Sequence, residues 1–103
     1  MANEFEVILC IVNTGFADVA MDAAKQFGAR GGTVLNARGT ASKDAEKIFN
    51  IAIQPEKEMV IILVKTDIKD NILQALHTTV GTNTPAQGIA FTLPVDDVVG
   101  ISK

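Results

Sequence analysis

The sequence predicts an α+β domain in which two helices cover one face of a four-stranded antiparallel sheet. Three observations support this fold class. Apolar runs rich in Val and Ile occur at four places, two intervening segments carry apolar residues at helical spacing, and glycine-rich turns end several of these segments. With 103 residues and 48% hydrophobic content, the chain is expected to fold as a single domain over residues 1–103.

The first part of the chain is predicted to form a strand, a helix and a second strand. Residues 4–12 are mostly apolar and end at a turn, so they are expected to form a buried strand. Residues 16–27 carry apolar side chains at successive helical turns, and Thr14 is available to cap this helix. A glycine pair then precedes a short strand over residues 33–38.

The second part repeats this order after a connecting excursion. Residues 40–58 are polar at first and then alternate, which indicates a connection that ends in strand. Residues 59–64 are continuously apolar and are expected to form a buried strand. A helix with Asp67 as its cap is predicted to end near Val80, and the last strand is expected at residues 89–93.

The resulting order, βαββαβ, is that of the ferredoxin-like split βαβ arrangement, with both helices on one face of the sheet. The opposite face then has no cover from within the chain. A mean hydropathy of +0.27 also indicates that apolar surface stays uncovered in a single copy. We therefore expect an oligomer in which other copies cover the open face.

Composition argues against several classes of protein. A net charge of -3 and a pI near 4.9 argue against a nucleic-acid partner, whose phosphates would require a basic surface. The only cysteine, Cys10, lies in an apolar run, which indicates a packing role in a reducing compartment. This run is too short to span a membrane and follows acidic residues, so a cytoplasmic location is expected.

Few residues are suited to catalysis or metal binding. The single histidine, His77, has no second His or Cys at ligand spacing, so a surface role is favoured over a metal ligand. Asp96 and Asp97 are adjacent and would face opposite ways on a strand. No cofactor is expected, and an enzyme is the weakest candidate. Acylphosphatases would need Arg and Asn in a different loop, and RNA-binding domains would need aromatic residues and a basic face.

Glycines and arginines lie on both sides of the second predicted strand. Arg30 and Arg38 are the two arginines of this segment, and Gly88 opens the last strand after a loop of hydroxyl and amide residues. Glycine lets backbone N–H groups approach phosphate, and arginine adds a charged fork. Neither the P-loop nor the Rossmann fingerprint occurs, so glycine content alone favours ordinary turns.

Two separated blocks, GARGGTVLNARG at residues 28–39 and GIAFTLPVDD at residues 88–97, strongly resemble the PII superfamily of nitrogen regulators, specifically its PII-like branch. The resemblance spans nearly the whole chain. It implies a homotrimer with effector sites in the clefts between subunits and an adenine nucleotide as the usual effector. It also implies regulation of a membrane transporter or metabolic enzyme through the loop after the second strand.

The resemblance further implies an effector site made from three segments. The first lies before and at the start of the second strand, at Arg30, Gly31, Gly32 and Thr33. The second closes that strand, at Arg38, Gly39 and Thr40. The third is the loop before the last strand, at Asn83, Thr84, Ala86, Gln87 and Gly88. The partner-binding loop is implied at Ala41, Ser42, Lys43, Asp44 and Lys47.

The chain departs from the PII pattern at charged positions. The PII sequence Gly-Asp-Gly-Lys is replaced by residues 86–89, AQGI, and two PII arginines fall at Gly100 and Ser102. The PII lysine before the third strand falls at Glu56, beside Lys57. A ligand with fewer phosphates, a cyclic or dinucleotide, or a small anion suits the remaining donors better. Two alternatives stay open: a CutA-like trimer that binds a divalent metal, and a ligand-free structural adaptor trimer.

Overall fold

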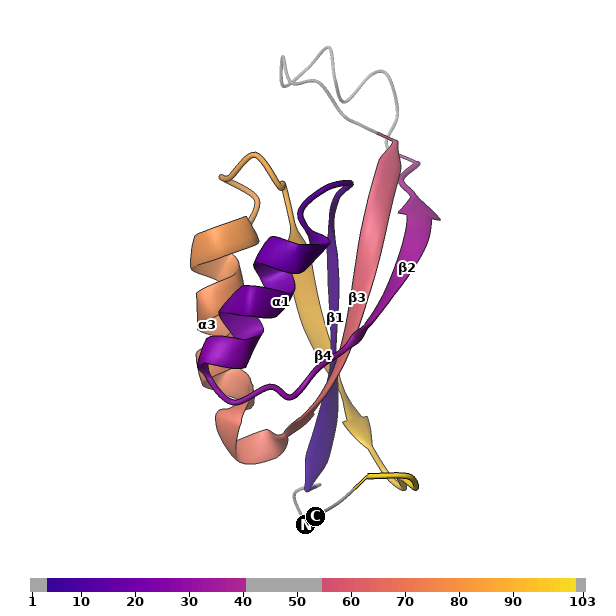
Figure 1. Cartoon of the computed structure of the whole chain (residues 1–103), viewed down its shortest axis with the longest axis vertical. Coiled ribbons are helices and arrows are strands. Elements are labelled where there is room, and N and C mark those ends of the chain that lie inside the picture. The colour runs from indigo at the N-terminus through magenta and orange to yellow at the C-terminus, as the bar shows by residue number, and fades with distance from the viewer. Residues whose placement is uncertain (1–3, 41–54, 102–103) are drawn as a thin grey trace.

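The computed structural model describes residues 4–40 and 55–101. Its elements follow the order β1 (Phe5–Asn13), α1 (Ala17–Gln26), β2 (Thr33–Arg38), β3 (Glu56–Lys65), α3 (Thr66–Val80) and β4 (Ile89–Val95). The strands form one antiparallel sheet in the order β2-β3-β1-β4, and both helices lie on one face of it (Figure 1). The predicted α+β, ferredoxin-like fold is confirmed.

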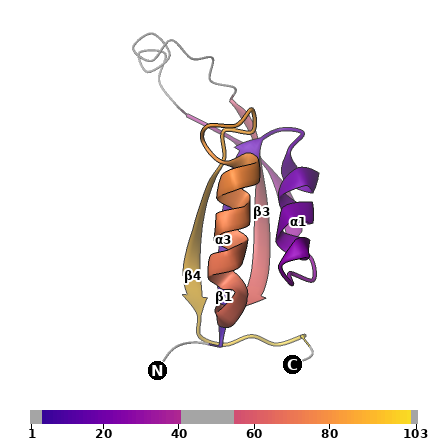
Figure 2. The ribbon, with the colours of Figure 1, turned by 90° about the vertical axis from the view of Figure 1, so that its left-hand side faces the viewer.

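The hydrophobic core lies between the helices and the two central strands. Figure 2 shows α1 and α3 side by side over the sheet. Alternate residues of β1 and β3 face the helices and are buried, as the period of two in a strand requires. The sheet supplies Ile8, Cys10, Val12, Val60, Ile62 and Val64 to this core. The helices supply Ala17, Ala20, Ala24, Ile72, Leu76 and Val80.

The other face of the sheet is apolar and has no covering element in the described part of the chain. The register places Leu9 of β1 between Ile61 of β3 and Phe91 of β4 on this face. On β4, Ile89, Phe91 and Leu93 are 53%, 43% and 50% exposed. Contiguous apolar surface of this kind is typical of a protein contact. The uncovered face expected from the sequence is therefore present.

The N-terminus of α1 is stabilised by a distant carboxylate, so the predicted cap is wrong. Thr14 lies two residues before the N-cap position, which is Phe16. Instead, Glu58 Oε1 accepts hydrogen bonds from the backbone N–H groups of Gly15, at 2.8 Å, and Ala17, at 3.3 Å. Glu58 reaches the helix because it occupies a helix-facing position of β3. A negative charge at this end also interacts favourably with the helix dipole.

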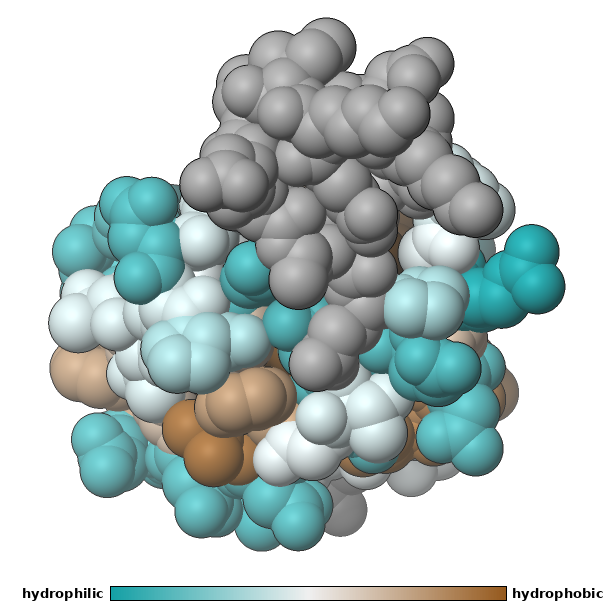
Figure 3. All heavy atoms as spheres, turned by 90° about the horizontal axis from the view of Figure 1, so that it is seen from above, coloured by the Kyte–Doolittle hydropathy of each residue, from teal (hydrophilic) through white to brown (hydrophobic). Residues whose placement is uncertain are grey.

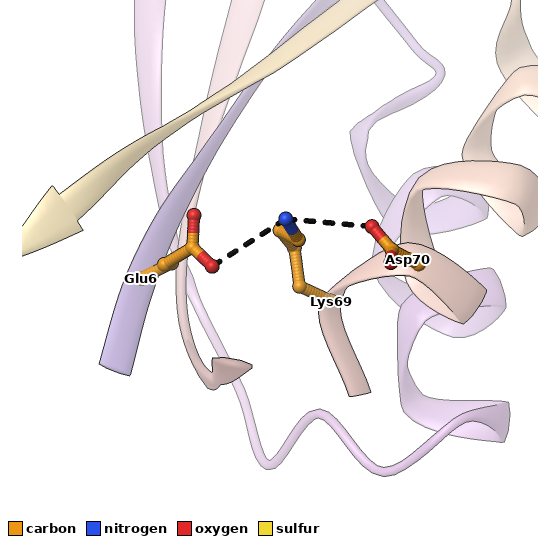
Figure 4. Close-up of polar contacts among 3 residues, drawn as sticks. All are labelled: Glu6, Lys69 and Asp70. Carbon is orange, nitrogen blue, oxygen red and sulfur yellow. Dashed lines mark ion pairs between the residues drawn. The ribbon is translucent and has the colours of Figure 1, made fainter. Parts of the chain in front are cut away.

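The predicted cap of α3 is wrong as well. The chain passes from β3 into the helix without a loop, so Lys65 is the N-cap residue and Asp67 already lies in the first turn. In that part of α3, Lys69 forms ion pairs with Glu6 of β1, at 3.5 Å, and with Asp70, at 3.4 Å (Figure 4). The Glu6 side chain is only 13% exposed. This pair therefore joins the start of α3 to the central strand.

Two strands are longer than their apolar runs indicated. β3 begins at Glu56 rather than at Met59, because its polar first residues still pair with β1 and β2. β4 continues to Val95 through Pro94, which an edge strand tolerates. The remainder of the predicted excursion, residues 41–54, lies outside the described residues. No helix in the described ranges is long and apolar enough to cross a membrane.

Candidate functional site

The expected effector residues of the first two segments lie at opposite ends of β2. Residues 30–33 precede and open the strand, whereas Arg38, Gly39 and Thr40 close it. Because β2 has six residues, the two groups are separated by about 17 Å along the strand, at a rise of about 3.3 Å per residue. A single chain therefore holds these two groups apart.

The second and third expected segments lie at the same end of the molecule, which we refer to as the loop end. It comprises residues 13–16, 38–40, 55–58 and 81–88. Figure 1 shows the turn after β1, the end of β2, the start of β3 and the loop before β4 together at this end. Figure 3 looks down on it and shows hydrophilic side chains around most of the described rim, with smaller apolar areas between them. Polar side chains thus predominate on the described part of this end.

Asn13 connects β3 to the loop before β4. Lys57 Nζ donates to Asn13 Oδ1 at 2.6 Å. Asn13 Nδ2 donates to the carbonyl of Pro85 at 3.0 Å and to Gln87 Oε1 at 3.5 Å. The backbone N–H of Asn13 donates to the Ala86 carbonyl at 2.9 Å. Asn13 is 4% exposed and is the only buried polar side chain in the described ranges, and both ends of its amide are satisfied.

Lys57 also lies against the end of β2. A Cβ added to Gly39 would be 3.1 Å from Lys57 Cε, so this glycine lets the lysine side chain pass close to the strand. Among the described residues, Asn13 is the polar partner of the Lys57 ammonium, and no carboxylate lies within ion-pair distance of it. An ammonium has three N–H donors. Lys57 is therefore a cation at the loop end that is bound to a neutral group.

The backbone of the loop before β4 is engaged in its own turns. Thr84 N–H donates to the Gly81 carbonyl at 3.0 Å, and Gln87 N–H donates to the Thr84 carbonyl at 3.0 Å. Gly88 N–H donates to the Val80 carbonyl at 2.7 Å, which closes the loop onto the end of α3. An anion at this loop would therefore depend on side chains such as that of Lys57 rather than on these three amides.

A pocket of about 310 Å³ lies on the other side of this loop, between α3 and β4. Its wall includes Gly88, Ile89 and the buried Cys10. Two exposed polar residues, His77 and Thr82, also line it. Burial raises the pKa of the Cys10 thiol to about 11. The thiol is therefore protonated at neutral pH and contributes apolar surface, as the sequence predicted, rather than a nucleophile.

In the segment that opens β2, the structure explains why one of the two adjacent glycines is a glycine. A Cβ at Gly32 would lie 2.8 Å from the Ile61 carbonyl oxygen and 3.0 Å from Met21 Sδ, so a side chain there would collide with β3. A Cβ at Gly31 would meet nothing within 4 Å. Arg30 and Thr33 are exposed. This segment thus presents open surface that another molecule could contact.

Other expected features lie elsewhere or are absent from the described part. The partner-binding residues Ala41, Ser42, Lys43, Asp44 and Lys47 lie outside the described residues. Residues 4–40 and 55–101 contain no group of three His, Cys, Asp or Glu side chains arranged to hold a metal ion. Asp96 and Asp97 follow the end of β4 and are both exposed.

No pattern in the sequence indicated a role for Asn13, and Lys57 stood out only as the neighbour of Glu56. Asn13 stands at the end of an apolar run, where an asparagine usually marks a turn. In the structure Glu56 of β3 lies opposite Arg38 of β2, whereas Lys57 of β3 lies opposite Asn13 of β1. Successive strand residues face opposite sides, so Lys57 and Glu56 point to different faces of the sheet. Of the two, only the Lys57 side chain bonds to Asn13, which in turn bonds to the loop before β4.

The family comparison matches almost the whole chain. The sequence profile of the family described as nitrogen regulatory protein P-II matches residues 5–103. The chain belongs to the P-II family. The resemblance noted in the sequence is thus confirmed for this P-II protein. None of the curated proteins compared with it is significantly similar.

Solved structures agree with this assignment. The structure is similar to that of Arabidopsis thaliana PII bound to citrate, with a TM-score of 0.73, 25% identity and coverage of 96% of this chain and 82% of that one. It is also similar to a B. subtilis GlnK-ATP complex (TM-score 0.70, 16% identity, coverage 92% and 84%) and to a functionally unknown protein from Pediococcus pentosaceus (TM-score 0.68, 16% identity, coverage 97% and 100%). The last two show the shared fold.

Proposed function

We propose that this P-II protein is a regulator, not an enzyme, that binds an adenine nucleotide or another small anion at clefts between the subunits of a homotrimer. It acts on a membrane transporter or metabolic enzyme through the loop after β2, which includes residues 41–47. The observation that carries this proposal is the Lys57 ammonium at the loop end, whose partner is a neutral amide. An anion would be a stronger partner for it than an amide oxygen.

The similar structures support an anionic effector. The Arabidopsis protein is bound to citrate and the B. subtilis protein to ATP, and both ligands carry several negative charges. Arg38 closes β2 at the same end as Lys57 and supplies a second cation. The chain has isoleucine, Ile89, in place of the PII phosphate-loop lysine. We therefore expect selectivity for a ligand with few phosphates.

The placement of the site residues favours a site shared between subunits. Residues 30–33 are too far along β2 to join the loop end of their own chain. The apolar open face and the two edge strands, β2 and β4, leave surface through which further copies can assemble. A head-to-tail contact closes into a ring when its rotation allows, and in the ring of three that we propose, residues 30–33 of one copy lie toward the loop end of the next.

A thermal-shift panel tests the effector. The purified protein is heated with ATP, ADP, AMP, cyclic AMP, cyclic di-AMP, citrate, 2-oxoglutarate, bicarbonate and divalent metals in turn. A ligand at a hundred times its Kd stabilises the folded state by about 2.7 kcal/mol, which raises the Tm by several degrees. A shift with one anion identifies the effector. A shift with a divalent metal alone would favour the CutA-like alternative, and no shift would favour the ligand-free adaptor.

Variants assign the shift to the loop end. Arg38→Ala and Lys57→Met should each weaken binding of the active compound about tenfold or more, because each removes a charged hydrogen bond. Lys65→Met is the matched control, since Lys65 is an exposed lysine at the opposite end of β3. Light scattering should give the same trimer mass for all three variants. Unchanged affinity in Arg38→Ala would remove that residue from the site.

A further inference from the structure

We propose that Asn13 is a positioning residue that couples the start of β3 to the loop before β4. Removing the Lys57 ammonium from Asn13, as an anionic effector would do, loosens that loop. The effector in this inference rests on the proposed function above. The coupling itself belongs to the unliganded chain and is tested without any effector.

Lys57 is tied to the residues that frame the loop after β2. Its side chain packs against Gly39, and Gly39 N–H donates to the Pro55 carbonyl at 2.6 Å. Thr14 N–H donates to the Glu56 carbonyl at 3.4 Å, which joins the same segment to the turn after β1. Any shift of residues 55–57 relative to β1 therefore moves the ammonium relative to Asn13.

Asn13 transmits the position of Lys57 because its two polar atoms are part of one rigid, planar amide. The ammonium requires an acceptor, so it holds Oδ1 toward β3 at 2.6 Å. Nδ2 is then directed at the opposite side, where it donates to the carbonyl of Pro85 and to Gln87 Oε1. A flipped amide would place an N–H donor against an N–H donor. Lys57 thus favours the same orientation of the Asn13 amide that the Pro85 carbonyl requires, and it reinforces the bonds from Asn13 to the loop.

Because Asn13 is buried, losing a hydrogen bond to its side-chain amide is costly. Asn13 is 4% exposed, so water is poorly placed to replace a lost partner. Without the ammonium, no described donor holds Oδ1 toward β3, and the amide keeps its orientation through the Nδ2 bonds to the Pro85 carbonyl and, at 3.5 Å, to Gln87 Oε1. These two bonds are then held less firmly. The loop would then open more often. Its Thr84, Gln87 and Gly88 amides, which are bonded within the loop and to α3, report such opening.

Amide hydrogen exchange in a double-mutant cycle tests the coupling. Exchange rates at Thr84, Gln87 and Gly88 are measured by NMR in the wild-type protein, in Lys57→Met, in Asn13→Ala and in the double variant. Lys57→Met should raise these rates about tenfold, the equivalent of one net hydrogen bond, although Lys57 bonds to none of the three. In the Asn13→Ala background, Lys57→Met should not raise the exchange rates further, because the side-chain amide that links Lys57 to the loop is absent.

Additive effects in the double variant, or unchanged loop rates in Lys57→Met, would overturn the inference. Asn13→Asp provides a second arm: aspartate still accepts from Lys57 but cannot donate, so the loop should exchange as fast as in Asn13→Ala. Slow exchange in Asn13→Asp would likewise overturn it. Lys65→Met controls for the lost charge, and unchanged exchange at Ile72, buried in α3, shows that each variant stays folded. Since no effector is present, failure of effector binding does not alter this result.

Discussion

Cys10 should make the stability of this protein fall steeply in alkaline solution. Its side chain is 1% exposed, and burial raises the pKa of the thiol from 9.0 to about 11. Above pH 9 the unfolded chain loses this proton while the folded chain keeps it, so the free energy of unfolding decreases as the pH rises. The difference between the two pKa values lowers the free energy of unfolding by about 2.7 kcal/mol at a pH above both values, and by about 1.4 kcal/mol near pH 10.

The assay is urea unfolding of the wild-type protein and of Cys10→Val, each at about pH 7.5 and about pH 10 and at one protein concentration. The wild-type protein should lose about 1.4 kcal/mol more than the variant between the two pH values. Asp70 and Glu6 raise the pKa of Lys69, which also costs stability at high pH, but this effect is common to both proteins and cancels. Equal losses in the two proteins would refute the reasoning.

Three further predictions concern packing and assembly. Glu58→Ala should lower the free energy of unfolding by about 1 kcal/mol, the usual worth of a helix cap, and Glu58→Gln by less because it keeps an acceptor; equal losses in urea unfolding would contradict a capping role. Gly88→Ala should cost about 1–3 kcal/mol because its Cβ would collide with the Val80 carbonyl, whereas Gly31→Ala, which meets nothing, should be tolerated; similar midpoints for both would contradict this. Leu9→Glu, at the centre of the open face, should give a monomer mass in light scattering, and a retained trimer would exclude this face from the contact.

The fold could be predicted because its core follows simple periods. Val60, Ile62 and Val64 alternate along β3, and Ile72, Leu76 and Val80 recur along α3, so each element showed its type in the sequence. The limits of elements were predicted less well. Residues 56–58 belong to β3 although they are polar, because pairing partners from β1 and β2 extend the strand beyond its apolar run.

The helix starts could not be predicted from neighbouring residues. α1 is capped by Glu58, which accepts hydrogen bonds from the N–H groups of Gly15 and Ala17. Glu58 is more than forty positions along the chain from both residues. A local pattern cannot reveal such a partner. The same limit applies to the loop end. Asn13 bonds to Lys57 and Pro85, which are 44 and 72 positions away, so only the folded sheet shows that these residues form one network.

The expected effector residues were located by resemblance rather than by physical pattern. Arg38 and Gly39 lie at the loop end with Lys57, and their place in an effector site stays a prediction. Their separation from residues 30–33 depends on the length and direction of β2, which the sequence also indicated. The role of the loop amides was harder to foresee, because it depends on how Gln87 and Gly88 bond within the loop and to α3.

The central position of β1 also determines when this chain can fold during its synthesis. β1 leaves the ribosome first, yet its partners are β3 and β4, and Cys10 meets Ala90 eighty positions later. Long-range pairing of this kind is slow, and the early strand stays exposed until its partners arrive. A nascent chain without β4 has no partner for one edge of its most apolar strand. We therefore expect completion of the domain only after translation passes Val95, and protection of the nascent chain by chaperones until then.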